Sequence, residues 1–312
     1  MDTDKIIELQ EMENFSKTFF SVIPGMEAAT GLSVVNAESL TRESFKKDWV
    51  SRNKACLIKG AIKHWPAVEK WRRKEHWLSN CDNIKVTIYP HLNYNDPKRQ
   101  MEGRVELGFH EAVDRLFQNK DHVFSFPGGQ IRDKSFSQVM NEQDLPGFSF
   151  LSPLERPRLY PQKRFFMYRR AATAWHAHNM DETLMCQVNG PKRVALFSPH
   201  IEQAKYVTEF LANELHLNGQ LMNADLRLKP MIADVEEGDA LYIPPYWHHA
   251  VVPLDGEVGF TLAYCWRSPL HIMGNHSNYF VRDLYDSGIW PPNYLRPIVK
   301  VYSGLLHSIR QS

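Results

Sequence analysis

The stretch TAWHAHNMDE, residues 173–182, decides how this sequence is interpreted. It places His176 and His178 one residue apart, where a strand is expected to end. Because alternate residues of a strand point to the same face of a sheet, both imidazoles can reach one metal ion. The chain contains 14 histidines, so a single pair is a weak signal and needs a further ligand.

A second run, GDALYIPPYWHH at residues 238–249, supplies that ligand from a distant part of the chain. A turn leads into an apolar strand expected over 240–243, and His248 and His249 follow the proline pair. This spacing suits a ligand at the mouth of a barrel. Imidazole binds iron, zinc, copper and nickel, and three protein ligands leave positions open for substrate or oxygen. We therefore expect a catalytic metal centre.

The middle of the chain is expected to be mainly β. From about residue 81 onward, short strand-like runs alternate with Pro, Gly and Asn clusters, and helices recede. This spacing is typical of an antiparallel sandwich or barrel. The expected strands are 84–89, 122–126, 164–168, 183–188, 193–197, 240–243 and 258–266.

Flanking helices are expected before the strands and after them. Thr41 can cap a helix that carries Phe45 and Trp49 on one face, a strand follows over 55–58, and Pro66 precedes another helix. We expect a helical lead-in over 1–30, a barrel domain with an N-terminal α/β cap over 31–268, and a helical extension over 269–312. An apolar stripe at helical spacing in the extension predicts either packing on the barrel or a homodimer seam.

Composition limits the class of protein. Hydrophobic residues make up 43% of the chain and charged residues 23%, as in ordinary globular domains. A net charge of +1 weighs slightly against nucleic acid as a partner, and the basic run at 70–74 is expected to be a solvated helix face. Four scattered cysteines, no leader sequence and no apolar run of about 18 residues predict a cytoplasmic protein with no membrane segment.

Beyond single motifs, the sequence resembles the Jumonji-C hydroxylases, which are Fe(II)- and 2-oxoglutarate-dependent oxygenases of the cupin superfamily. The likeness begins with LIKGAIKHWPA at residues 57–67, continues through CQVNGPKRVALFSP at 186–199, and ends at Trp266. It implies a double-stranded β-helix, the jelly-roll barrel of the cupins, and a non-haem iron dioxygenase with 2-oxoglutarate as cosubstrate.

The resemblance also assigns residues. His176 matches the family's first metal ligand, and His249 matches the distal one within an IPxxWxH pattern. Thr173, three residues before the first ligand, and Lys192 match residues that bind the cosubstrate. A lysine suits this role because an ammonium ion in a partly dry barrel is costly unless an anion neutralises it. Val194 and Leu196 share a face with Lys192, which points that side chain inward.

One position departs from the family pattern. The second ligand is usually an acid, and His178 stands there, so the metal site is one charge unit more positive. One extra residue also separates His176 from the following strand, and a local bulge could instead bring Asp181 or Glu182 to the metal. His176, His178, Glu182 and His249 also resemble the three-histidine, one-glutamate set of other cupins, which need no 2-oxoglutarate.

Three functions are therefore open at this point. The resemblance favours a 2-oxoglutarate-dependent hydroxylase of a protein side chain or a small molecule. The second reading is a cupin-type metal enzyme without cosubstrate, and the third is an inactive binding module in which His178 marks a lost acid. Metal analysis separates the binding module from the two enzymes, and 2-oxoglutarate turnover separates the enzymes from each other.

Overall fold

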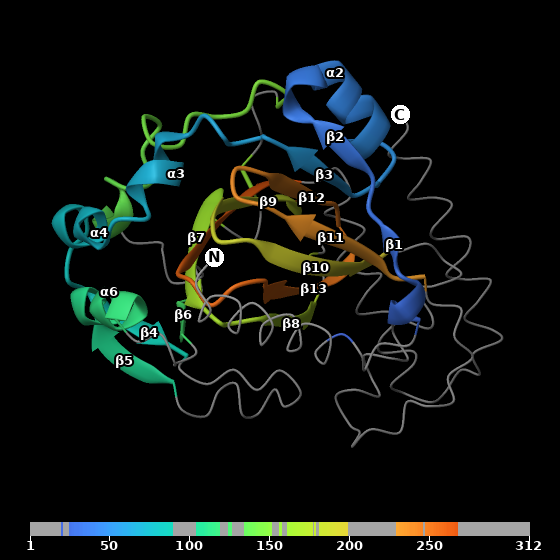
Figure 1. Cartoon of the computed structure of the whole chain (residues 1–312). Coiled ribbons are helices and arrows are strands. Elements are labelled where there is room, and N and C mark those ends of the chain that lie inside the picture. The colour runs from blue at the N-terminus through green and yellow to red at the C-terminus, as the bar shows by residue number, and fades with distance from the viewer. Residues whose placement is uncertain are drawn as a thin grey trace, which may run out of the picture.

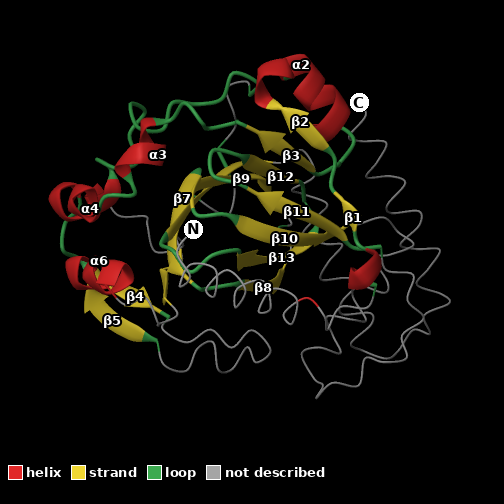
Figure 2. Cartoon of the chain, in the orientation of Figure 1, coloured by secondary structure: helices red, strands yellow, loops and turns green. Residues whose placement is uncertain are grey.

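Two facing β-sheets form the centre of the molecule. The computed structural model describes residues 20, 25–89, 104–118, 124–126, 134–151, 156–157, 161–176, 178, 181–198, 229–245 and 247–267. Within these residues the sheets enclose an interior, and the helices lie outside it (Figures 1 and 2). The expected mainly β fold with flanking helices, a jelly-roll barrel, is confirmed.

The sheets contain almost all of the strands. The five-stranded sheet has the order β1 (Thr30–Gly31), β11 (Met231–Val235), β10 (Lys192–Phe197), β13 (His248–Pro253) and β8 (Thr173–His176). The seven-stranded sheet has the order β2 (Val34–Asn36), β3 (Cys56–Lys59), β12 (Ala240–Ile243), β9 (Asp181–Asn189), β14 (Gly259–Arg267), β7 (Lys163–Arg169) and β6 (Phe124–Phe126). A small sheet pairs β4 (Lys85–Ile88) with β5 (Val105–Gly108). Pairing is antiparallel except between β1 and β11 and between β2 and β3.

Short helices connect and cover the sheets. They are α2 (Arg42–Phe45), α3 (Pro66–Lys70), α4 (Lys74–Asn80) and α6 (Phe109–Gln118), with one π turn at Lys46–Val50 and 3₁₀ turns at Met26–Ala28, Ala37–Ser39 and Lys134–Phe136. The Thr41 hydroxyl accepts a bond from the backbone N–H of Ser44, which confirms the predicted cap. None of the helices in the described ranges is long and apolar enough to cross a membrane.

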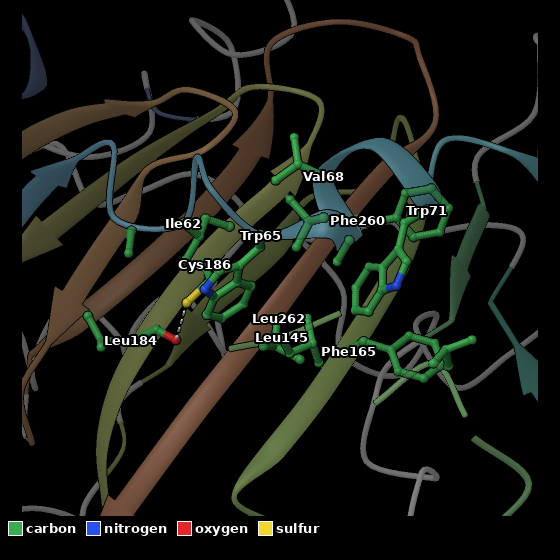
Figure 3. Packing of buried hydrophobic residues seen from close by; sticks show 14 of the residues in the cluster. Ile62, Trp65, Val68, Trp71, Leu145, Phe165, Leu184, Cys186, Phe260 and Leu262 are labelled. Atoms are coloured by element: carbon green, nitrogen blue, oxygen red, sulfur yellow. Dashed lines mark hydrogen bonds between the residues drawn. The ribbon is translucent and has the colours of Figure 1, made fainter. Parts of the chain in front are cut away.

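Successive side chains of β9 point to opposite faces of the sheet and belong to two different apolar clusters. Leu184 and Cys186 belong to a large outer cluster, whereas Met185 belongs to a smaller cluster whose other members come from both sheets. Because neighbouring strand residues face opposite sides, the smaller cluster fills the barrel interior and the larger one lies outside the seven-stranded sheet. In the outer cluster, Trp71, directly after α3, packs against Phe165 of β7 and Phe260 of β14 (Figure 3). Trp77 of α4 stacks on the ring of Phe260.

The turn before β12 is fixed by one buried carboxylate. Asp239 accepts hydrogen bonds from Lys59 Nζ at 2.6 Å, the Gly60 backbone N–H at 2.9 Å and the Glu236 backbone N–H at 3.2 Å. Gly238 and Gly60 both have positive φ, at 87° and 70°, which side chains rarely adopt. The GD pair singled out in the sequence therefore ties the start of β12 to β3.

Two sequence-based expectations need correction. The region after residue 81 contains the helix α6, whose Phe109, Val113 and Leu116 are buried at helical spacing. This periodic signal is present in the sequence but is outweighed by the strand-like runs around it. The helix expected after Pro66 is two short helices, α3 and α4. The lead-in before Phe20 and the C-terminal extension lie outside the described residues.

We expect Asp239→Ala to destabilise the fold by about 2–4 kcal/mol, because it leaves two backbone N–H groups and a lysine without their acceptor. Urea unfolding followed by circular dichroism measures this change in the free energy of unfolding. Asp82→Ala, which removes an exposed carboxylate, is the control and should shift it by less than about 0.5 kcal/mol. Equal effects of the two substitutions would contradict the structural role of Asp239.

Candidate metal centre

Pairing of β8 with β13 brings the first and last of the predicted ligands together. His176 lies directly opposite His249 in the register of the two strands, and the ring centroids are 4.1 Å apart. These residues are far apart in the sequence, so only the sheet makes them neighbours. His248, on the opposite face of β13, pairs with Phe197 of β10.

His178 completes a group of three imidazoles. Its ring centroid is 5.1 Å from that of His176 and 5.0 Å from that of His249. One ring nitrogen of each residue lies within 4.8 Å of the corresponding nitrogens of the other two. His178 and His249 are buried, and His176 is half-buried. The sequence-based grouping of these three side chains agrees with their placement.

Hydrogen bonds fix how two of the rings are presented. His249 Nδ1 is 2.9 Å from the Trp247 carbonyl oxygen, which can only accept, so Nδ1 carries the proton and Nε2 has a free lone pair. His178 Nδ1 lies 3.0 Å from Thr183 Oγ1, and when Nδ1 is the donor of this hydrogen bond, Nε2 has a lone pair for a ligand bond. Partners of this kind orient metal-binding histidines and raise their basicity.

The electrostatic surroundings favour neutral rings. Burial, followed by the neighbouring His176, lowers the pKa of both His178 and His249 well below the usual value. The neutral imidazole is the form that binds a metal. Three neutral nitrogen donors fit a first-row transition metal, with positions left open for other ligands. The donor set therefore fits the metal that the sequence predicts.

The two acids considered as alternative ligands do not join this group. Glu182 has the same parity along β9 as the outer-cluster residues Leu184 and Cys186, and its carboxylate accepts a 2.7 Å hydrogen bond from the Tyr242 hydroxyl. Asp181 has the inward parity of Met185 and is fully buried, but it is not one of the grouped ligands. Among the described residues, the structure forms a three-histidine group without a carboxylate.

Thr173 shares a face with His176 despite their odd spacing. Thr173 is opposite Val251 and His176 is opposite His249, so three steps along β8 match two steps along β13. This β-bulge lies upstream of His176, whereas the extra residue considered in the sequence falls downstream, where residues 177, 179 and 180 lie outside the described ranges. Since Val251 and His249 both point inward, the bulge turns exposed Thr173 toward the side of the metal group.

Lys192 lies on the interior face of β10 with Val194 and Leu196, as predicted. Its side chain is buried, and Nζ lies 3.7 Å from the centroid of the Tyr168 ring. Burial alone lowers its pKa from 10.5 to about 7. No hydrogen bond or ion pair joins Nζ to any residue in the described ranges. An anion placed beside Nζ would offset the cost of burying the ammonium form of this amine.

Sequence reasoning missed Thr183. Thr183 contacts His178 and also lies 3.7 Å from Cys265 Sγ, which in turn lies 3.7 Å from an Arg164 guanidinium nitrogen. These four side chains come from β7, β9, β14 and the segment after β8. No local motif connects them, so their contacts could not be read from spacing along the chain.

The chain is similar in sequence to several known proteins. A family model described as cupin-like domain matches residues 42–272. Jumonji C domain-containing protein 5 of Drosophila melanogaster is 24% identical over 250 residues, covering 73% of this chain and 60% of that protein. This chain thus spans about three-fifths of the length of the fly relative.

Two human proteins are similar over larger shares of their own length. tRNA wybutosine-synthesizing protein 5 is 24% identical over 258 residues, covering 75% of this chain and 78% of that protein. Bifunctional peptidase and (3S)-lysyl hydroxylase JMJD7 is 26% identical over 260 residues, covering 70% of this chain and 80% of that protein.

Thr183→Val is expected to weaken metal binding about tenfold, because His178 loses the hydrogen bond that orients its ring. Thr183→Ser, which keeps the hydroxyl, should restore it. Titration with Zn(II) against a competing chelator measures the affinity. Thr261→Val serves as a control, because it removes another inward hydroxyl whose partner is Gln187, away from the imidazoles. Equal affinities for the Thr183→Val and Thr183→Ser proteins would rule out this role of Thr183.

Proposed function

We propose that this chain, which belongs to the cupin-like domain family, is an Fe(II)- and 2-oxoglutarate-dependent dioxygenase. The single observation that carries the proposal is a buried lysine, without a counter-ion among the described residues, on the same interior face as three grouped imidazoles. The imidazoles suit a metal ion, and the lysine suits a carboxylate. A dicarboxylate that binds the metal through its 2-oxo acid end would contact both groups.

His176, His178 and His249 would hold the metal. Fe(II), when bound, would supply the redox chemistry by which oxygen, 2-oxoglutarate and a substrate C–H bond are converted to succinate, carbon dioxide and the hydroxylated substrate. The chain's own part is to present three neutral nitrogens from one side. Thr183 and the Trp247 carbonyl keep two of these rings in the productive orientation.

Lys192 would bind the distal carboxylate of 2-oxoglutarate. It pairs with Pro253 of β13, four residues from His249, which corresponds to about 13 Å along the strand. The lysine stem and the cosubstrate together can bridge this distance. In binding, the ammonium form of Lys192 gains the counter-ion that it lacks among the described residues. Thr173, on the same face as His176, is the proposed second cosubstrate contact.

His178 distinguishes this site from the two-histidine, one-carboxylate arrangement. Replacing an acid by a neutral imidazole leaves the metal one charge unit more positive, which strengthens the attraction for an anionic cosubstrate. The same replacement is the observation that favours the second candidate, a cupin-type metal enzyme that uses no 2-oxoglutarate. We prefer the first because nothing in the second explains a lysine that is buried and lacks a carboxylate contact within the described ranges.

The proposed substrate is a protein side chain or a small molecule. One similar protein is named a lysyl hydroxylase and two others are named lysine-specific and arginine-specific demethylases, whereas another is named a tRNA wybutosine-synthesizing protein. In the basic run at 70–74, three of the four cationic side chains form ion pairs, Lys70 with Asp144, Arg72 with Glu237 and Lys74 with Asp114. This pairing weighs against nucleic acid at that surface.

The domain limits, the cytoplasmic location and the homodimer seam remain predictions. The family match at 42–272 falls largely within the barrel domain expected over 31–268.

We expect the protein to convert 2-oxoglutarate to succinate in the presence of Fe(II), and His176→Ala and His249→Ala to abolish both metal content and turnover. Succinate is measured by mass spectrometry and metal by elemental analysis. His248→Ala is the matched control, since it removes a neighbouring imidazole from the opposite face of β13 and should retain the metal. Metal binding with no succinate would favour the cosubstrate-free enzyme, and no metal binding would favour the binding module.

Affinity for 2-oxoglutarate should fall as the pH rises above about 7. In the free protein Lys192 has a pKa of about 7 and loses its proton near that pH, whereas a bound carboxylate requires the ammonium form, so binding takes up a proton at higher pH. The Kd should rise by up to about tenfold per pH unit. Calorimetry with Zn(II)-loaded protein between about pH 6.5 and about pH 9 tests this sign.

Lys192→Met should bind 2-oxoglutarate more weakly and lose the pH dependence. Lys85→Met, which removes an exposed lysine, should behave like the unaltered protein. A pH dependence that survives in the Lys192→Met protein would show that another group takes up the proton.

A further inference from the structure

We propose that Tyr168 is a positioning residue for cosubstrate binding, whose ring face holds the Lys192 ammonium group in the barrel interior where the distal carboxylate arrives. This inference rests on the proposed function and deepens it. Tyr168 is not one of the grouped metal ligands, so its role would be exerted through Lys192.

The contact between these residues crosses the interior from one sheet to the other. Lys192 belongs to β10 of the five-stranded sheet and Tyr168 to β7 of the seven-stranded sheet. Nζ lies over the ring, 3.7 Å from its centroid, well within the range of a cation–π interaction. Such an interaction is strongest where water is excluded, and both side chains are buried. The ring therefore offsets part of the cost of placing a cation there.

Two glycines, Gly259 and Gly190, lie next to the Tyr168 ring. Gly259 lies directly opposite Tyr168 in the register of β14 with β7. A Cβ atom at Gly259 would be 2.0 Å from Tyr168 Cζ, so no other residue fits unless the ring moves. Gly190, with φ of 72°, also lies close, since a Cβ there would be 3.6 Å from the Tyr168 hydroxyl. The two glycines leave the space that the ring occupies.

Hydrogen bonds hold the far end of the ring. Gln187 Nε2 donates to the Tyr168 hydroxyl oxygen at 2.7 Å, and the hydroxyl donates to the Gly190 carbonyl at 3.3 Å. Thr261 in turn donates to Gln187 Oε1 at 2.9 Å. Burial raises the pKa of Tyr168, so the phenol stays neutral and keeps its proton for the carbonyl. With the hydroxyl engaged on both sides, the ring face is the part that acts on Lys192.

The arrangement explains how Lys192 stays directed inward before cosubstrate binds. A flexible lysine without a carboxylate contact would gain by turning its ammonium group toward water. The ring gives it a partner that leaves the other side of the ammonium open. A distal carboxylate then adds a charge contact without displacing the ring. The benefit of Tyr168 should therefore appear only for ligands that carry a distal carboxylate.

The test compares two ligands on Zn(II)-loaded protein by calorimetry. 2-Oxoglutarate has the distal carboxylate, and 2-oxobutyrate has the same metal-binding end without it. Tyr168→Leu should raise the Kd for 2-oxoglutarate about tenfold and leave that for 2-oxobutyrate unchanged. Tyr168→Phe, which keeps the ring, should retain most of the affinity. Phe165→Leu is the matched control, because it removes a buried ring from the other face of the same strand.

Gly259→Ala provides a second measurement that does not depend on losing the ring. In the unaltered protein it should displace Tyr168 and weaken 2-oxoglutarate binding, whereas in the Tyr168→Leu protein it should add little. Equal effects in both backgrounds, or equal losses for both ligands in Tyr168→Leu, would overturn the inference. The unaltered protein tests the proposed function separately. If it binds neither ligand, or binds 2-oxobutyrate and 2-oxoglutarate equally, the proposed function is contradicted, and the role of Tyr168 is contradicted with it.

Discussion

The antiparallel pairing of β13 with β8 on one side and β10 on the other is the constraint on which the rest of the site depends. It sets His249 opposite His176 and, four residues further on, sets Pro253 opposite Lys192. The metal group and the buried amine are therefore placed by the register of a single strand. A slip of one residue would turn the His249 imidazole and the inward apolar residues of β13 to the outer face of the sheet.

The two faces of β9 have different roles, because its inward residues support the site and its outward residues pack in the outer cluster. Its inward residues include Thr183 and Gln187, which hold His178 and Tyr168 in place. Its outward residues Leu184, Cys186 and Val188 belong to the outer cluster, which also contains residues of α3, α4 and α6. Large buried rings contribute strongly to stability, and most of those in the described residues belong to the outer cluster, on the face that the site does not use. The interior can then carry polar and charged groups that weaken a core, because the outer cluster stabilises the same sheet.

Charge is the unusual property of the interior. The grouped ligands are three neutral imidazoles, and the buried amine at Lys192 has no carboxylate contact in the described ranges. A metal bound here would keep its full positive charge, which differs from a site with a carboxylate ligand. In the proposed function, such an interior would hold one end of the anionic cosubstrate at the metal and the other at Lys192. The uncharged Tyr168 ring, which lies opposite Gly259, holds the Lys192 ammonium group through a cation–π contact until an anion binds.

The sequence by itself determined the mainly β class, the cap at Thr41 and the inward direction of Lys192, because these depend on local spacing and alternation, and it offered His176 and His249 as candidate ligands. It could not decide between His178, Asp181 and Glu182, since that choice depends on which face of β9 each acid takes and where the bulge in β8 lies. Nor could it pair Thr183 with His178 or Tyr168 with Lys192. Those contacts join residues of different strands and sheets, and only closure of the barrel brings them within reach.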